Sequence, residues 1–152
     1  MAEAARTVIL PTSEKTPQTW RYTTDKPADD WFKADFDDSA WKSGPGGFGT
    51  ENTPGATVRT TWNSADIWIR REFDVKDAVS SPLLMMHHDE DAKVYINGVL
   101  AAKAPGYVSE YEEFDLSPQA KAGIKTGKNT IAIHCHQTTG GQYIDAGIVD
   151  SK

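Results

Sequence analysis

Apolar and polar side chains alternate in short runs along the chain. The clearest run, NTIAIHCH over residues 129–136, places its two isoleucines and its cysteine on one face and His134 and His136 on the other. A period of two is that of an extended strand, in which successive side chains point to opposite faces. Comparable runs predict strands over residues 18–23, 66–74, 83–88, 92–96, 99–102, 112–116 and 142–149. About eight short strands separated by turn signals are typical of an all-β sandwich or barrel.

Turn and helix signals divide these strands. The Asn97-Gly98 pair stands between two of the runs and predicts a tight hairpin, because both of its residues accept a positive φ. One short helix is expected over residues 117–122, where Ser117 can cap the first turn. Residues 43–57 (SGPGGFGTENTPGAT) predict a long loop, of the kind that is often functional.

Length and composition bound the class of protein. The chain has 152 residues, which suits one domain, and we expect an N-terminal extension over residues 1–16 and a single domain over residues 17–150. The net charge of -6 and the scattered Lys and Arg disfavour nucleic acid and membrane surfaces as partners. No stretch is long enough to span a bilayer, and residues 1–6 lack the apolar core of a signal peptide. Cys135 is the one cysteine, which excludes an internal disulfide.

Five segments resemble those of a known family in their order and spacing. They are residues 31–41 (WFKADFDDSAW), 66–75 (DIWIRREFDV), 91–98 (DAKVYING), 106–116 (GYVSEYEEFDL) and 127–133 (GKNTIAI). Together they look like the sugar-binding domain of family 2 glycoside hydrolases and of related multidomain glycan-processing proteins. The resemblance implies a galactose-binding-like jelly-roll β-sandwich beside a catalytic domain, in a parent enzyme that is secreted or periplasmic. It implies no catalytic residue in this chain, because the catalytic acids of that family lie in a different domain.

Residues suited to a sugar concentrate in a few segments. Flat rings cover the apolar C–H face of a pyranose, and amides and carboxylates bind its hydroxyls. The segment QTTGGQYID over residues 137–145 carries this mixture, although an ordinary hairpin with Tyr143 in the core is the alternative. For Trp62 the alternative is a plug in the end of the sandwich. The candidate sugar-binding residues are Trp62, Asn63, Tyr107, Tyr111, His134, His136, Gln137, Gln142, Tyr143 and Asp145.

Three groups of residues raise the question of a metal ion. His134 and His136 share a strand face, as in cupin metal sites, but the carboxylate that such a site needs a few residues later is absent. Oxygen atoms for a structural calcium ion could come from Asp35, Asp37 and Asp38, although their spacing resembles no dedicated calcium loop. The run HHDED over residues 87–91 predicts a turn, with contacts to a sugar or a metal as alternatives. Beyond the calcium alternative, no cofactor is expected.

The favoured function is a non-catalytic carbohydrate-binding or accessory module of a larger glycoside hydrolase-like enzyme. Its partners would be carbohydrate and the catalytic domain of the parent chain. One alternative is a structural docking domain with no ligand of its own, which an exposed apolar patch would favour. The other is a cupin-like metal-dependent enzyme that uses His134 and His136.

Overall fold

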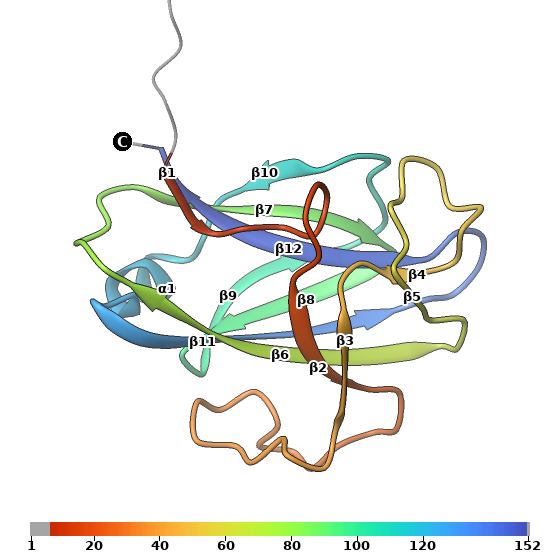
Figure 1. Cartoon of the computed structure of the whole chain (residues 1–152), viewed down its shortest axis with the longest axis horizontal. Helices are drawn as coiled ribbons and strands as arrows, with labels where there is room; N and C mark the ends of the chain where they lie inside the picture. Colours follow the sequence, from red (N-terminus) through yellow and green to blue (C-terminus); the bar gives the residue numbers. More distant parts are fainter. Residues whose placement is uncertain (1–6, 152) are drawn as a thin grey trace, which may run out of the picture.

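Two β-sheets face each other in the computed structural model, which describes residues 7–151 (Figure 1). The β7–β12 sheet has the order β10 (Glu112–Phe114), β7 (Pro82–Asp89), β12 (Tyr143–Asp150), β4 (Phe48–Gly49) and β5 (Thr60–Thr61), with β1 (Thr7–Leu10) paired to β12. The β6–β11 sheet has the order β3 (Lys42–Pro45), β2 (Thr19–Thr23), β6 (Asp66–Val75), β11 (Gly127–His136), β8 (Asp91–Ile96) and β9 (Val99–Ala104). The β4–β5 pair is parallel and the other pairs are antiparallel. The all-β sandwich expected from the alternation is confirmed.

The hydrophobic core lies between the two sheets. Ile131 and Ile133 of β11 belong to the same fully buried apolar cluster as Ile144 of β12. Full burial of such a side chain contributes about 2 kcal/mol. His134 and His136, at the alternate positions of β11, are half-buried on the outer face of the sheet. The period of two read from the sequence therefore decides which residues of β11 enter the core.

The elements predicted from the sequence are present. All eight expected strands form, and α1 (Pro118–Gly123) is the expected helix. The Ser117 side chain caps α1 by accepting a hydrogen bond from the amide of Ala120 at 3.2 Å. The β8–β9 hairpin turns at Asn97 (φ 51°) and Gly98 (φ 78°), as this pair predicts. Within residues 7–151, no helix is long and apolar enough to cross a membrane.

Four short strands lie where the sequence predicts none. β3 and β4 overlap the segment expected to be one long loop, and β5 follows it. They are too short and too rich in glycine or threonine to show a period. β1 pairs with β12 and Leu10 is buried, so the sandwich begins at Thr7 and not at residue 17. The expected extension is corrected accordingly, and residues 1–6 lie outside the described residues.

Arg70 of β6 holds residues 24–41 over the outer face of the β6–β11 sheet (Figure 1). Its side chain is almost fully buried, and its Nε donates to Asp38 Oδ2 at 2.9 Å. The other guanidinium nitrogens donate to the carbonyl oxygens of Trp31 at 2.8 Å, Lys33 at 3.0 Å and Phe36 at 3.3 Å. Much of the family-like segment over residues 31–41 (WFKADFDDSAW) therefore covers the outer face of the sheet, and the hydrogen bonds of Arg70 hold it there.

Two of the three aspartates in this segment have partners within the protein. Asp38 accepts from Arg70, and Asp37 accepts from the amide of Ser39 at 3.0 Å. The hydrogen bonds from the Ser39 side chain and amide lower the pKa of Asp37. In the described residues, no group of three or more His, Cys, Asp or Glu is arranged to hold a metal ion. The suggestion that Asp35, Asp37 and Asp38 supply oxygen atoms for a calcium ion therefore gains no support from side-chain geometry and stays a prediction.

We expect Arg70→Met to lower the free energy of unfolding by about 3 kcal/mol, because it leaves a carboxylate and three carbonyl groups without their buried donor. Urea unfolding followed by tryptophan fluorescence measures the loss. Glu72→Gln on the same strand is the matched control, since the Glu72–Lys128 ion pair is exposed and should contribute less than about 0.5 kcal/mol. Equal losses in the two variants would contradict the role of Arg70.

Candidate functional site

A hollow of about 350 Å³ lies at one end of the sandwich. It is lined by Pro54, Asp89, Glu90, Tyr107, Ser109 and residues 139–141. These come from four separate segments: the β4–β5 loop, the β7–β8 turn, the chain after β9 and the β11–β12 loop. Ligand sites are usually concave and combine an apolar surface with a few polar groups. This hollow is therefore the candidate functional site.

The β7–β8 turn places two carboxylates at the hollow. β7 ends at Asp89 and β8 begins at Asp91, so Glu90 alone connects one sheet to the other. Tyr107 forms an antiparallel bridge with Asp89, and the amide of Val108 donates to the carbonyl of His88 at 3.0 Å. The chain after β9 is thereby fastened beside the turn. Tyr107 itself is 65% exposed, so much of the residue is accessible to a ligand.

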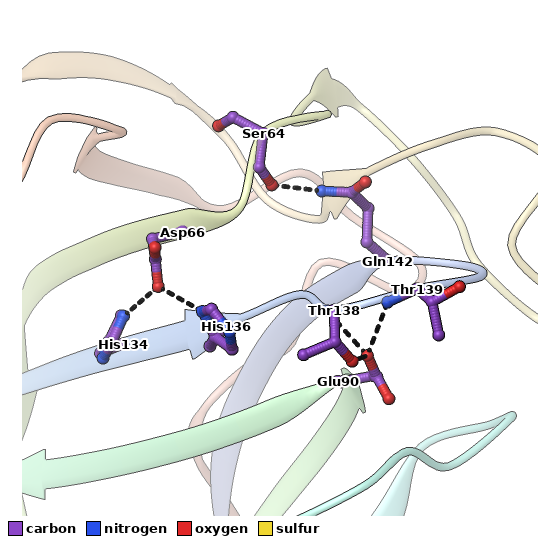
Figure 2. Close-up of polar contacts among 8 residues, drawn as sticks. All are labelled: Ser64, Asp66, Glu90, His134, His136, Thr138, Thr139 and Gln142. Atoms are coloured by element: carbon purple, nitrogen blue, oxygen red, sulfur yellow. Dashed lines mark hydrogen bonds and ion pairs between the residues drawn. The ribbon is translucent and has the colours of Figure 1, made fainter.

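Glu90 ties the turn to the β11–β12 loop (Figure 2). Its Oε1 accepts hydrogen bonds from the Thr138 amide at 2.8 Å, the Thr139 amide at 3.1 Å and the Thr138 hydroxyl. These three donors, with the Thr138 hydroxyl first, lower the pKa of Glu90. The side chain therefore carries its negative charge at neutral pH and holds the loop in place.

Asp89 is the opposite case. Its side chain is buried, with the residue only 6% exposed, and among the described residues none donates a hydrogen bond to its carboxylate. Burial and, second, the neighbouring Glu90 raise the pKa of Asp89 to about 6. The residue also lines the hollow, so its carboxylate can accept a hydrogen bond from a ligand hydroxyl there.

A second clamp positions the β4–β5 loop. The Thr53 hydroxyl donates to the carbonyl of Gln142 at 3.0 Å and accepts from the amide of the same residue at 2.9 Å. The Gln142 side chain donates to the carbonyl of Ser64 at 3.0 Å (Figure 2). Gln142, a predicted sugar-binding residue, is therefore buried, and its backbone and side-chain amide join three loops. Its contacts bring Pro54 to the rim of the hollow.

His134 and His136 share one partner, Asp66, and neither lines the hollow (Figure 2). His134 Nε2 and His136 Nδ1 each lie 2.8 Å from Asp66 Oδ1, and the His134 ring stacks on Trp68 at 4.7 Å between centroids. Burial alone would raise the pKa of Asp66, but the hydrogen bonds from His136 and His134 outweigh it and lower that pKa. In residues 7–151 no set of three metal-binding side chains forms, so a cupin-like centre here lacks its ligands.

Tyr111, Tyr143 and Asp145 form a separate buried cluster on the outer face of the β7–β12 sheet. Asp145 Oδ2 accepts from the Tyr111 hydroxyl and from the Ser13 amide, both at 2.6 Å. The two tyrosine hydroxyls lie 3.0 Å apart, and that of Tyr143 donates to the carbonyl of Thr57 at 2.8 Å. Residues of the β4–β5 loop and of the chain after β1 therefore cover this cluster. Tyr143 and Asp145 are fully buried, and neither lines the hollow.

Burial changes the acidity of this buried cluster. It raises the pKa of Asp145 to about 6, against the effect of the hydrogen bond from Tyr111. It also raises the pKa of both tyrosines. His87 packs against Tyr143 with ring centroids 4.6 Å apart, and burial, followed by nearby His88, lowers the pKa of His87 to about 4. His87 is therefore neutral at physiological pH.

The structure divides the predicted sugar-binding residues into groups. Tyr107 lines the hollow, while Gln137, which donates to the carbonyl of Gly140 at 2.9 Å, supports the loop that lines it. Asn63 is exposed before β6, whereas Trp62 is 2% exposed and belongs to the core. The sequence analysis favoured a turn for Asp89 and Glu90 and gave contact with a sugar only as an alternative, because a run of Asp and Glu before a hairpin strand is typical of a turn.

Asp145→Asn tests the buried carboxyl. Since its folded-state pKa of about 6 exceeds the ordinary 3.8, the folded state binds the proton more tightly, and stability falls as the pH rises from about 4 to about 6. Asparagine can place its oxygen at the Oδ2 position and keep both hydrogen bonds. We expect the variant to reduce this fall by on the order of 2 kcal/mol, measured by urea unfolding across the pH range. An unchanged fall, matching that of the exposed control Asp77→Asn, would contradict the assignment.

Comparison with known proteins adds the fold family. No protein-family model matches the sequence, and no curated protein matches it. A β-glucuronidase from glycoside hydrolase family 2 is similar at a TM-score of 0.64 and 15% identity, over 98% of this chain and 18% of that chain. A glycoside hydrolase family 2 member from Bacteroides cellulosilyticus DSM 14838 is similar at a TM-score of 0.63 and 15% identity, over 93% of this chain and 21% of that chain. A β-glucuronidase of an uncultured Clostridium sp. is similar at a TM-score of 0.60 and 12% identity, over 99% of this chain and 30% of that chain.

These similarities concern a part of each larger protein. This chain spans 18% to 30% of the length of the three chains, and nearly all of it is matched in each case. At such low identity the likeness is one of fold. It agrees with the five family-like segments of the sequence: the chain has the fold of a domain-sized part of family 2 glycoside hydrolases.

Proposed function

We propose that the chain is a non-catalytic module of a larger glycoside hydrolase-like enzyme and that it contacts carbohydrate at the hollow. The observation that carries this proposal is the exposed ring of Tyr107 in the same hollow as the Asp89 and Glu90 carboxylates. An aromatic face and hydroxyl-binding oxygens on one concave surface are the two elements that a pyranose requires.

The fold supports the accessory role. The matched part is 18% to 30% of each glycoside hydrolase, so most of each enzyme lies outside the region that this chain resembles. The polar groups of the chain also favour binding over turnover. Glu90 Oε1 accepts hydrogen bonds from three loop donors, and the rings of His134 and His136 both hydrogen-bond with Asp66.

Docking on the catalytic domain of the parent chain is the second candidate function. Its support is a shallow groove of about 270 Å³ near β1, lined largely by apolar side chains that include Val8, Met85 and Val149. Val8 is 59% exposed, and it pairs with Val149 near the end of β12 that lies away from the hollow. The two functions are compatible, because docking and sugar contact would use opposite ends of the β7–β12 sheet.

Titration of the ¹⁵N-labelled chain with methyl β-D-glucopyranoside and methyl β-D-galactopyranoside tests the sugar contact. We expect amide shifts at residues 89–90, 107–109 and 138–141, with a dissociation constant in the millimolar range, or about -4 kcal/mol. Tyr107→Ala should weaken binding about ten-fold because the ring face is lost.

Val8→Ala is the control, since it also truncates an exposed apolar side chain but at the other end of the sheet. It should leave the titration unchanged. Absence of shifts with both glycosides, or equal weakening by the two variants, would contradict sugar contact at the hollow.

A further inference from the structure

We propose that the hollow selects an uncharged pyranoside over a uronate, and that the carboxyl group of Asp89 binds the hydroxyls of that sugar. This inference rests on the proposed function and narrows it to a class of ligand. It follows from the charge of the lining, the fixed position of Glu90 and the unpaired state of Asp89.

The lining of the hollow has a single sign of charge. Among the described residues that line it, two are carboxylates and none is Lys, Arg or His. A uronate requires a cationic or amide-rich partner for its own carboxylate, most often a guanidinium. Here such a group would instead meet Asp89 and Glu90. The lining therefore favours hydroxyl groups over a second carboxylate.

The charge on Glu90 cannot move away from an incoming anion. Three donors from Thr138 and Thr139 hold Oε1 and keep the group ionised. His136 is the group near this carboxylate that can become a cation, and its Nδ1 already forms a hydrogen bond with Asp66. Relief of the repulsion would require the β11–β12 loop to release Glu90. The loop and the turn thus hold a fixed negative charge at the rim of the hollow.

Asp89 provides the specific contact. It is more than nine-tenths buried, it lines the hollow, and among the described residues its carboxylate receives no hydrogen bond. Gly141 keeps space beside it, because a Cβ at that position would lie 3.1 Å from Asp89 Oδ2 and 3.0 Å from the Thr53 side chain. A sugar hydroxyl in the hollow can donate a hydrogen bond to this carboxylate, whereas a ligand carboxylate offers no donor at neutral pH.

Two ligands that differ only at C6 test the selection. Methyl β-D-glucopyranoside carries a hydroxymethyl group there and methyl β-D-glucuronide carries a carboxylate; the galactose and galacturonate glycosides form a second such pair. In titrations of the full chain at neutral pH and low salt, we expect each uronide to bind about ten-fold more weakly than its neutral counterpart. High salt should reduce the difference.

The outcomes separate the inference from the proposed function. Binding of a uronide as tight as that of its neutral counterpart overturns the inference and leaves sugar binding intact. Binding of none of the four glycosides overturns the proposed function and the inference with it.

Variants assign the effect to the two carboxylates. Glu90→Gln keeps an oxygen for the loop donors and removes the charge. It should therefore reduce the ratio of affinities between the neutral glycoside and the uronide of each pair about three-fold. Asp89→Asn should weaken the neutral glycosides about ten-fold, because an acceptor is replaced by a donor. Asp77 is exposed in the β6–β7 connection at the other end of the sandwich. Asp77→Asn makes the same change in net charge, and it should alter neither the affinity for the neutral glycosides nor the difference in affinity within each pair. Equal effects of Asp77→Asn and Glu90→Gln overturn the role of the hollow.

Discussion

The pairing of β11 with β6 over ten consecutive residues is the interaction on which the rest of the structure depends. It fixes which side chains of both strands enter the core, because a slip of one residue would exchange the two faces. Ile131 and Ile133 are buried in this register, and His134 and His136 meet Asp66 on the outer face. The β11–β12 loop at the candidate site begins at the end of β11, whose position this register determines.

The candidate site follows from how the chain passes between the sheets. β7 and β8 belong to different sheets, and Glu90 is the one residue between them. The crossing brings Asp89 to the end of one sheet and Glu90 to the edge of the other, within reach of Thr138 and Thr139. The short crossing keeps the two residues adjacent at the hollow, and the Thr138 and Thr139 donors hold the Glu90 carboxylate in place.

Residue type predicted candidate sugar-binding residues but not where the fold places them. Tyr107 lines the hollow. Tyr143 and Asp145 have the right chemistry, yet they are covered by the chain after β1 and by the β4–β5 loop. Nothing in a period of two shows whether the outer face of a sheet meets solvent or a loop. For the same reason Asp89, read as part of a turn, is a buried group at the site.

The sequence by itself determined the eight main strands, the Asn97-Gly98 hairpin and the cap of α1, because alternation, turn conformation and capping are local properties. Only the tertiary structure decided the four short strands, the cover held by Arg70 and the assembly of the hollow. These depend on contacts between residues far apart in the chain. The residues of these features show no local sequence pattern, because their positions depend on the packing of the strands that precede and follow them.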